Sequence, residues 1–192
     1  MPKRNNKTNE ADFWGMARSF LHSYCPKVRG LSYKTVEAYR ISLESFIAYV
    51  GEADGATGAD VTFDLVDRDH IKGWVSWMSG QRAYSPKTVG LRLTAMRSFL
   101  AYCAAEDATL QAVFQMAKSV KGPTPPKKRI EYLEDDELAA MLAANDGATT
   151  KSRRNRAMLI MLYESAARVS ELTSMTLGDL VLSSPAYVTV TG

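Results

Sequence analysis

The sequence predicts a mainly α protein: a small domain of four to five helices, followed by the start of a second, mostly α domain that contains a first β-strand. Apolar residues recur at helical spacing between residues 12 and 120. The segment 121–130, KGPTPPKKRI, then interrupts regular structure with a glycine and three prolines. An alternating pattern typical of a strand is found at 185–191.

Length and composition limit the possible classes of protein. A chain of 192 residues with 46% hydrophobic content can bury one good core or two small ones. No stretch approaches the roughly 18 consecutive apolar residues of a membrane span, and no signal-peptide core follows the first ten residues. Cys25 and Cys103 lack metal-ligand spacing and fit a reducing compartment. We therefore expect a cytoplasmic protein without a metal site.

The charge of the chain is divided unevenly. Residues 1–130 carry 19 Lys and Arg against 12 Asp and Glu, a net charge of +7, whereas residues 131–192 carry 5 against 9, a net charge of −4. A positive excess in the first two thirds favours a polyanionic partner there. Ordinary surface lysines would explain the charge equally well.

The first domain is expected at 10–120, after a basic arm at 1–9. Its first helix runs from residue 12 to residue 24 and is stopped by Pro26; the second runs from Ser32 to Gly51. A third helix is capped by Asp67 and closes at Gly80. Ser85 and Pro86 then supply an N-cap and a first helical residue, and a fifth helix covers about 109–120.

Two of these helix starts nearly repeat each other: Ser32-Tyr-Lys34-Thr35 and Ser85-Pro-Lys87-Thr88. Each places a cation and a hydroxyl in the first turn, where backbone N–H groups also point outward, and such an end can bind a DNA phosphate. A plain capping signature with solvated charges is the alternative. The other candidate DNA contacts are Arg40, Arg92 and Arg97 along the helices, and Lys127, Lys128 and Arg129 in the linker 121–130.

The second domain, 131–192, opens with acidic residues that suit the first turn of a helix. Residues 157–163, AMLIMLY, are apolar all round and predict a helix that is buried on all sides. Arg168 follows this helix. Because an arginine is rarely buried unpaired, it is either in a structural salt bridge or directed at an anion, for which its planar fork is suited. The strand at 185–191 is expected to be a single strand with no partner in the remaining sequence.

The run from Arg154 to Leu180, with Arg168-Val-Ser-Glu171-Leu after the apolar helix and Leu-Gly-Asp beyond it, resembles the first catalytic-arginine box of the tyrosine recombinases, or phage integrases. The resemblance implies that Arg168 binds the scissile phosphate of double-stranded DNA and that Glu171 supports it. Residues 10–120 resemble the core-binding domain of that family. Ala166 stands where the family usually has glycine, and a turn that needs positive φ would strain it.

The family cleaves and rejoins DNA in site-specific recombination through a covalent tyrosine–phosphodiester link, which needs no cofactor. It does so as a tetramer on paired sites, often for mobile elements. Its lysine, His-x-x-Arg and tyrosine come after the arginine box, yet no Lys, His or Arg follows Arg168, and Tyr187 is expected in the strand. We therefore expect the parent to be an enzyme, and this chain to be an inactive, monomeric DNA-binding part of it.

Three other interpretations remain open. The first is a truncated, non-catalytic DNA-binding protein that competes for recombination sites. The second is a helical transcription regulator with Ser85–Leu100 as its recognition helix, although 74–82 is a poor partner helix. The third is a helical protein-interaction module, which would have no duplex affinity at any salt concentration.

Overall fold

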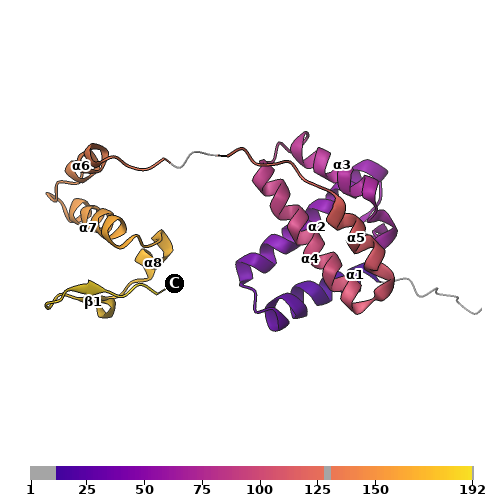
Figure 1. The fold of residues 1–192 in the computed structure, drawn as a ribbon, viewed down its shortest axis with the longest axis horizontal. Coiled ribbons are helices and arrows are strands. Elements are labelled where there is room, and N and C mark those ends of the chain that lie inside the picture. The colour runs from indigo at the N-terminus through magenta and orange to yellow at the C-terminus, as the bar shows by residue number, and fades with distance from the viewer. Residues whose placement is uncertain (1–11, 128–130, 192) are drawn as a thin grey trace, which may run out of the picture. The chain divides into compact units, whose positions relative to one another are not determined.

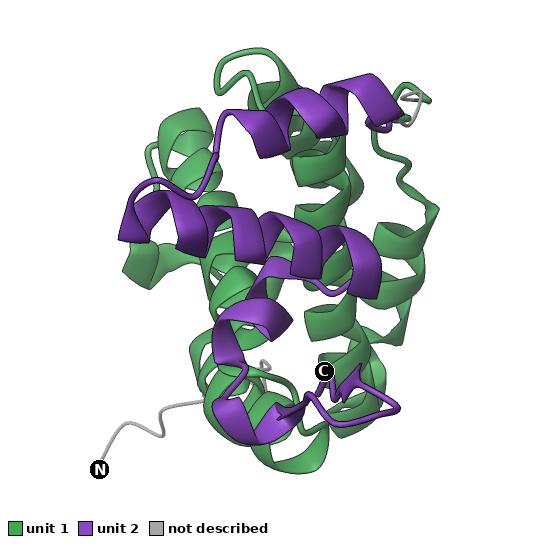
Figure 2. Cartoon of the chain, turned by 90° about the vertical axis from the view of Figure 1, so that its left-hand side faces the viewer, with its two compact units in different colours: residues 1–127 green, residues 128–192 purple. Residues whose placement is uncertain are grey.

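The structure, a computed structural model, describes residues 12–127 and 131–191. It divides into two compact units, residues 1–127 and 128–192 (Figure 2). The arm expected at 1–9, together with Lys128 and Arg129, lies outside the described residues. Both units are built from helices, and the prediction of a mainly α protein is confirmed.

Unit 1 is a bundle of crossing helices (Figure 1). Its N-terminal end consists of α1 (Phe13–Ser19) and a π-helix (Phe20–Val28) that continues from it without a break. The long helices α2 (Tyr33–Asp54) and α4 (Pro86–Glu106) pack against each other, and the shorter helices α3 (Arg68–Ser79) and α5 (Gln111–Ser119) complete the bundle. Short 3₁₀ turns join α2 to α3 and α4 to α5.

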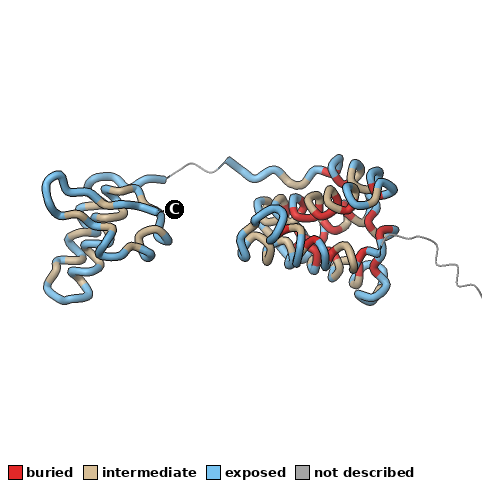
Figure 3. The backbone as a smooth tube through the Cα atoms, turned by 90° about the horizontal axis from the view of Figure 1, so that it is seen from below, coloured by how far each residue is buried: buried red, intermediate tan, exposed pale blue. Residues whose placement is uncertain are grey.

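The core of unit 1 is aromatic and closely packed. Phe46, Trp74 and Phe99 are fully buried, and the ring centroids of Phe46 and Trp74 lie 5.4 Å apart in an edge-on arrangement. Phe20 of the π-helix packs edge-on against Phe99, with centroids 5.5 Å apart. Edge-on contacts of this kind add to the free energy gained by burial. The buried residues lie on the inner faces of the helices (Figure 3).

The prediction that Pro26 stops the first helix is wrong. The chain passes from α1 into a π-helix that contains Pro26 and ends at Val28. In an α-helix the proline ring clashes with the carbonyl four residues earlier. The wider i→i+5 turn of a π-helix displaces that carbonyl, so the helix continues through the proline and carries Cys25 into the core.

The end of α5 is fastened to α4. The Arg97 guanidinium of α4 donates to the backbone carbonyls of Ala117, over 3.3 Å, and of Val120. Gly122 lies so close to Leu93 that a Cβ at position 122 would be 2.8 Å from the Leu93 Cδ1 atom. The chain therefore stays attached to unit 1 beyond the last residue of α5.

Unit 2 contains α6 (Asp135–Ala143), α7 (Thr150–Ser165), α8 (Val169–Ser174) and two short strands. The strands, β1 (Leu180–Val181) and β2 (Tyr187–Val188), are antiparallel, with Leu180 opposite Val188. The prediction of a single strand without a partner is therefore wrong. Two apolar residues directly after a 3₁₀ turn (Leu177–Asp179) were enough to form the partner strand.

The prediction that the apolar segment 157–163 is buried on all sides is also wrong. It forms the second half of α7, but Met158, Ile160 and Tyr163 are 36%, 42% and 54% exposed. Among the described residues of unit 2 none is fully buried (Figure 3). Three helices and a small hairpin offer too few neighbours to surround α7, so one of its apolar faces remains open to solvent.

Candidate nucleic-acid interface

The starts of α2 and α4 have the same local structure. Ser32 and Ser85 are the N-caps, with φ and ψ of −62° and 153° at Ser32 and −61° and 150° at Ser85. The Ser32 Oγ atom accepts a hydrogen bond from the Thr35 N–H over 3.3 Å, and the Ser85 Oγ atom accepts one from the Thr88 N–H over 3.2 Å. Each cap satisfies one N–H of its helix end and leaves the others for an outside acceptor.

The first turns expose a lysine each. Lys34 and Lys87 are exposed, while the hydroxyls of Thr35 and Thr88 lie 3.0 Å and 2.9 Å from the serine hydroxyls of their caps. Both helices begin at the same, left-hand side of unit 1 in Figure 1 and cross farther along. The arrangement places two cations and two helix N-termini on one side of the unit, where the helix dipoles also favour an anion.

Arg40 is already paired. Its Nε and Nη2 atoms donate to the two carboxylate oxygens of Glu37 over 2.9 Å and 2.6 Å, and its Nη1 atom pairs with Glu44. All three side chains lie on one flank of α2. Because two carboxylates surround one guanidinium, this flank carries no excess positive charge, and it is a weaker candidate for a phosphate contact than the two lysines.

The arginines of α4 make contacts inside unit 1. The Arg92 Nη1 atom donates to the Ile41 carbonyl of α2 over 3.0 Å, and its guanidinium lies 4.8 Å from the ring centroid of Tyr84. Arg97 holds the end of α5, as described above. The sequence predicted both as DNA contacts, because the carbonyls that they reach lie far away in the sequence. Lys127, in contrast, is exposed.

Arg168 stands between α7 and α8 and is the N-cap residue of α8. Its side chain is 79% exposed, whereas that of Glu171 is 11% exposed. The Glu171 carboxylate accepts a hydrogen bond from the Arg168 N–H over 2.7 Å and also pairs with the guanidinium. The hydrogen bond from the Arg168 backbone N–H, and to a smaller extent the one from its guanidinium, lower the pKa of Glu171. The carboxylate therefore orients a guanidinium whose outer side faces solvent.

The turn that presents Arg168 is strained. Ala166 ends α7 with φ of 51° and ψ of 22°, in the left-handed region that favours glycine. The sequence indicated this possibility, because glycine is the residue expected there. Downstream, the Asp179 carboxylate accepts hydrogen bonds from the N–H and hydroxyl of Thr176, over 2.8 Å and 2.9 Å, and these fix the turn that leads into β1.

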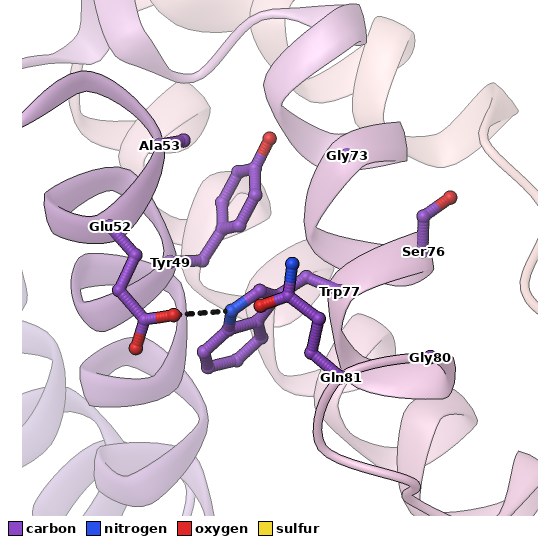
Figure 4. Close-up of a pocket in the computed structure, with 8 residues that line it drawn as sticks. All are labelled: Tyr49, Glu52, Ala53, Gly73, Ser76, Trp77, Gly80 and Gln81. Carbon is purple, nitrogen blue, oxygen red and sulfur yellow. Dashed lines mark hydrogen bonds between the residues drawn. The ribbon is translucent and has the colours of Figure 1, made fainter.

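A separate hollow of about 510 Å³ lies between α2 and α3. In Figure 4 the aromatic rings of Tyr49 and Trp77 stand in it, and Trp77 Nε1 donates to Glu52 over 2.8 Å. The Glu52 carboxylate also pairs with Arg82, which stacks on Trp77 at 4.5 Å from the ring centroid. Glu52 is the only carboxylate that lines the hollow, and both Trp77 and Arg82 already bind it. The residues that line the hollow therefore include no pair of groups suited to acid–base chemistry.

His70 connects α3 to the end of α2. Its Nε2 atom lies 2.9 Å from an Asp54 oxygen, and its Nδ1 atom lies 2.9 Å from an Asp67 oxygen. Partial burial lowers the pKa of His70, but the hydrogen bonds and charges of the two carboxylates outweigh it, so that the pKa is raised above 6.5. The pair with Asp54 joins residues that lie 16 positions apart in the sequence, a separation that no local sequence pattern identifies.

Within 12–127 and 131–191, no group of three or more His, Cys, Asp and Glu side chains is placed to hold a metal ion. No helix in these ranges is both long and apolar enough to cross a membrane.

Comparisons with known proteins agree with one another. Residues 19–107 match the family model described as phage integrase, N-terminal SAM-like domain. The chain is similar to the putative integrase/recombinase y4rC of Sinorhizobium fredii, at 25% identity over 185 residues, which is 96% of this chain and 56% of that protein. It is also similar to the tyrosine recombinase XerD of Oceanobacillus iheyensis, at 30% identity over 80% of this chain and 49% of that protein.

A solved structure, the XerA recombinase, is similar with a TM-score of 0.41 and 18% identity, over 93% of this chain and 59% of that one. The chain spans about half the length of the curated relatives that it matches.

Proposed function

Since the chain belongs to the tyrosine recombinase, or phage integrase, family, we propose that it binds double-stranded DNA as the N-terminal part of a site-specific recombinase. The observation that carries the proposal is the pair of similar helix starts, Ser32 to Thr35 and Ser85 to Thr88, with an exposed lysine in each. A duplex offers phosphates along both edges of a groove, so two such starts on one side of a unit can bind it together.

Within unit 1 the contacts divide into two kinds. Lys34 and Lys87 are proposed as phosphate ligands, with Thr35 and Thr88 completing the caps beside them. Arg92 and Arg97 support the scaffold through the carbonyls they reach, and Arg40 contributes little because of its two carboxylates. Lys127, Lys128 and Arg129 of the linker 121–130 are proposed to contact the DNA backbone.

In unit 2, we propose that Arg168 binds the scissile phosphate. An exposed guanidinium held from one side by Glu171 is suited to this, because its remaining N–H groups are directed outward in a fixed orientation. Donors already oriented toward the non-bridging oxygens stabilise the charge that develops there, and loss of one such donor lowers a rate by about 10² to 10³. The residues present supply this arginine but no candidate nucleophile, so for residues 1–192 we propose binding without strand cleavage.

Duplex affinity and its dependence on salt test the proposal. A fluorescent duplex of mixed sequence is titrated with the chain at several salt concentrations, and the slope of log affinity against log salt concentration is measured. Each lost phosphate contact lowers this slope by about 0.9, so we expect the double variant Lys34→Gln, Lys87→Gln to lower it by about 2.

The matched control removes the same charge elsewhere in unit 1. Lys72 of α3 and Lys118 of α5 are exposed and lie on other helices. We expect the double variant Lys72→Gln, Lys118→Gln to keep the slope of the natural chain. Equal slopes for the two double variants would show that the helix starts are not part of the DNA interface. Absence of duplex affinity in the natural chain would overturn the proposal as a whole.

A further inference from the structure

The solvent-facing surface next to the two lysines is apolar. Leu91 of α4 is 63% exposed, and Ile41 of α2 is 40% exposed. Leu91 follows Lys87 by four residues and Ile41 follows Lys34 by seven, spacings that place each apolar side chain on the same face of its helix as the lysine. The exposed leucine and isoleucine leave apolar surface in contact with water beside the two cations, and burying that surface against a partner is favourable.

The two apolar residues belong to helices that contact each other. Arg92, the neighbour of Leu91, donates from Nη1 to the carbonyl of Ile41 over 3.0 Å. This hydrogen bond joins the two helices through the side chain of Arg92 and the backbone of Ile41. The exposed residues of the two helices include Lys34 and Ile41 on α2 and Lys87 and Leu91 on α4.

The charge around this surface indicates what covers it. From Pro86 to Ala105, α4 carries three cations, Lys87, Arg92 and Arg97, and no carboxylate. On α2 the neighbouring carboxylates of Glu37 and Glu44 are paired with Arg40. A second copy of this surface would bring like charges together. The major groove of DNA offers what fits: phosphates at its edges, for the lysines, and thymine C5-methyl groups on its floor, for apolar side chains.

We propose that Leu91 and Ile41 contact thymine methyl groups in the major groove and thereby set part of the base preference of unit 1. The inference rests on the proposed DNA binding and adds to it the two residues that read bases. Lysines on phosphates give affinity without sequence information, whereas contacts with base edges provide it.

The experiment begins with a pool of random-sequence duplexes. Duplexes retained by the natural chain are selected and sequenced, and the affinity of the selected duplex is compared with that of a copy in which uracil replaces every thymine. Uracil keeps the pairing and lacks the methyl group. We expect the natural chain to lose affinity by about fourfold for each methyl that it contacts, and the variants Leu91→Ala and Ile41→Ala to lose less of this thymine preference.

Ile160→Ala provides a matched control, because Ile160 is 42% exposed on α7, a helix outside unit 1. We expect it to keep the full thymine preference. Equal affinity of the natural chain for thymine and uracil duplexes, or failure of the pool to yield a preferred sequence, would overturn the base-reading role while leaving phosphate binding intact. Absence of any duplex retention would overturn both this inference and the proposed function.

Discussion

The strained residue Ala83 offers a test of the backbone of unit 1. It lies between α3 and α4 with φ of 51°, and its side chain is exposed. A left-handed conformation costs a non-glycine residue about 1–2 kcal/mol. The substitution Ala83→Gly removes this cost but gives the unfolded chain more freedom, which offsets about 0.4–1 kcal/mol. The exposed methyl group buries nothing, so we expect a net gain in unfolding free energy of about 0.5–1 kcal/mol.

Tryptophan fluorescence measures this gain in urea. All three tryptophans, Trp14, Trp74 and Trp77, belong to unit 1, and the last two are buried in its core. With a urea dependence of about 2 kcal/mol per molar, the midpoint should rise by roughly 0.3 M. The slope of the transition should not change, because the substitution alters no buried surface.

An alanine in the right-handed, α-helical backbone conformation is the matched control. Ala48 is exposed in the middle of α2, where the same change to glycine removes a residue with high helix propensity and should cost about 1 kcal/mol. The two substitutions are therefore expected to shift the midpoint in opposite directions. A lower midpoint for Ala83→Gly, as for Ala48→Gly, would refute the assignment of strain at Ala83.

Two further predictions concern charged groups of unit 1. Because the pKa of His70 is raised above 6.5 in the folded chain, its contribution to stability is complete below that value and is lost as pH rises through the folded pKa. The urea midpoint of the natural chain should therefore fall as pH rises above 6.5 and through the higher folded pKa of His70. The midpoint of His70→Gln should fall less, and parallel curves for the two chains would contradict the bridge. Arg97→Ala should lower unfolding free energy by about 1.5–3 kcal/mol through loss of charge-assisted hydrogen bonds, and unchanged stability with weaker duplex binding would make Arg97 a DNA contact instead.

Sequence patterns predicted local features of the backbone more accurately than they predicted the packing of distant residues. The N-caps Ser32 and Ser85 were predicted from residue type alone, because a cap depends on a hydroxyl and the next three residues. The positive φ at Ala166 was anticipated from the family resemblance, because glycine usually stands at this position in the family. The continuation of the helix through Pro26 was missed, since the choice of a π-helix depends on how Phe20 and Cys25 reach the core.

Features that depend on distant residues were not predictable in this way. Arg97 and Lys87 look alike in the sequence as cations of one helix, yet only Arg97 reaches the carbonyls of α5. The burial expected for 157–163 followed from composition, whereas burial requires neighbouring elements that unit 2 does not supply. The partner of the strand at Tyr187 was missed because two residues, Leu180 and Val181, are too short a run to identify as a strand.

The attachment of α5 to α4 determines where the connection between the units begins. Because Arg97 holds Val120 and Gly122 packs against Leu93, the chain is anchored on unit 1 up to Gly122. Residues 123–134 can span at most about 40 Å when fully extended. In the proposed DNA complex, a unit 2 tethered this closely to unit 1 meets the same duplex at an effective concentration on the order of millimolar. The proposal therefore requires only a weak affinity of unit 2 for its phosphate, and it implies that unit 2 releases the duplex once unit 1 dissociates.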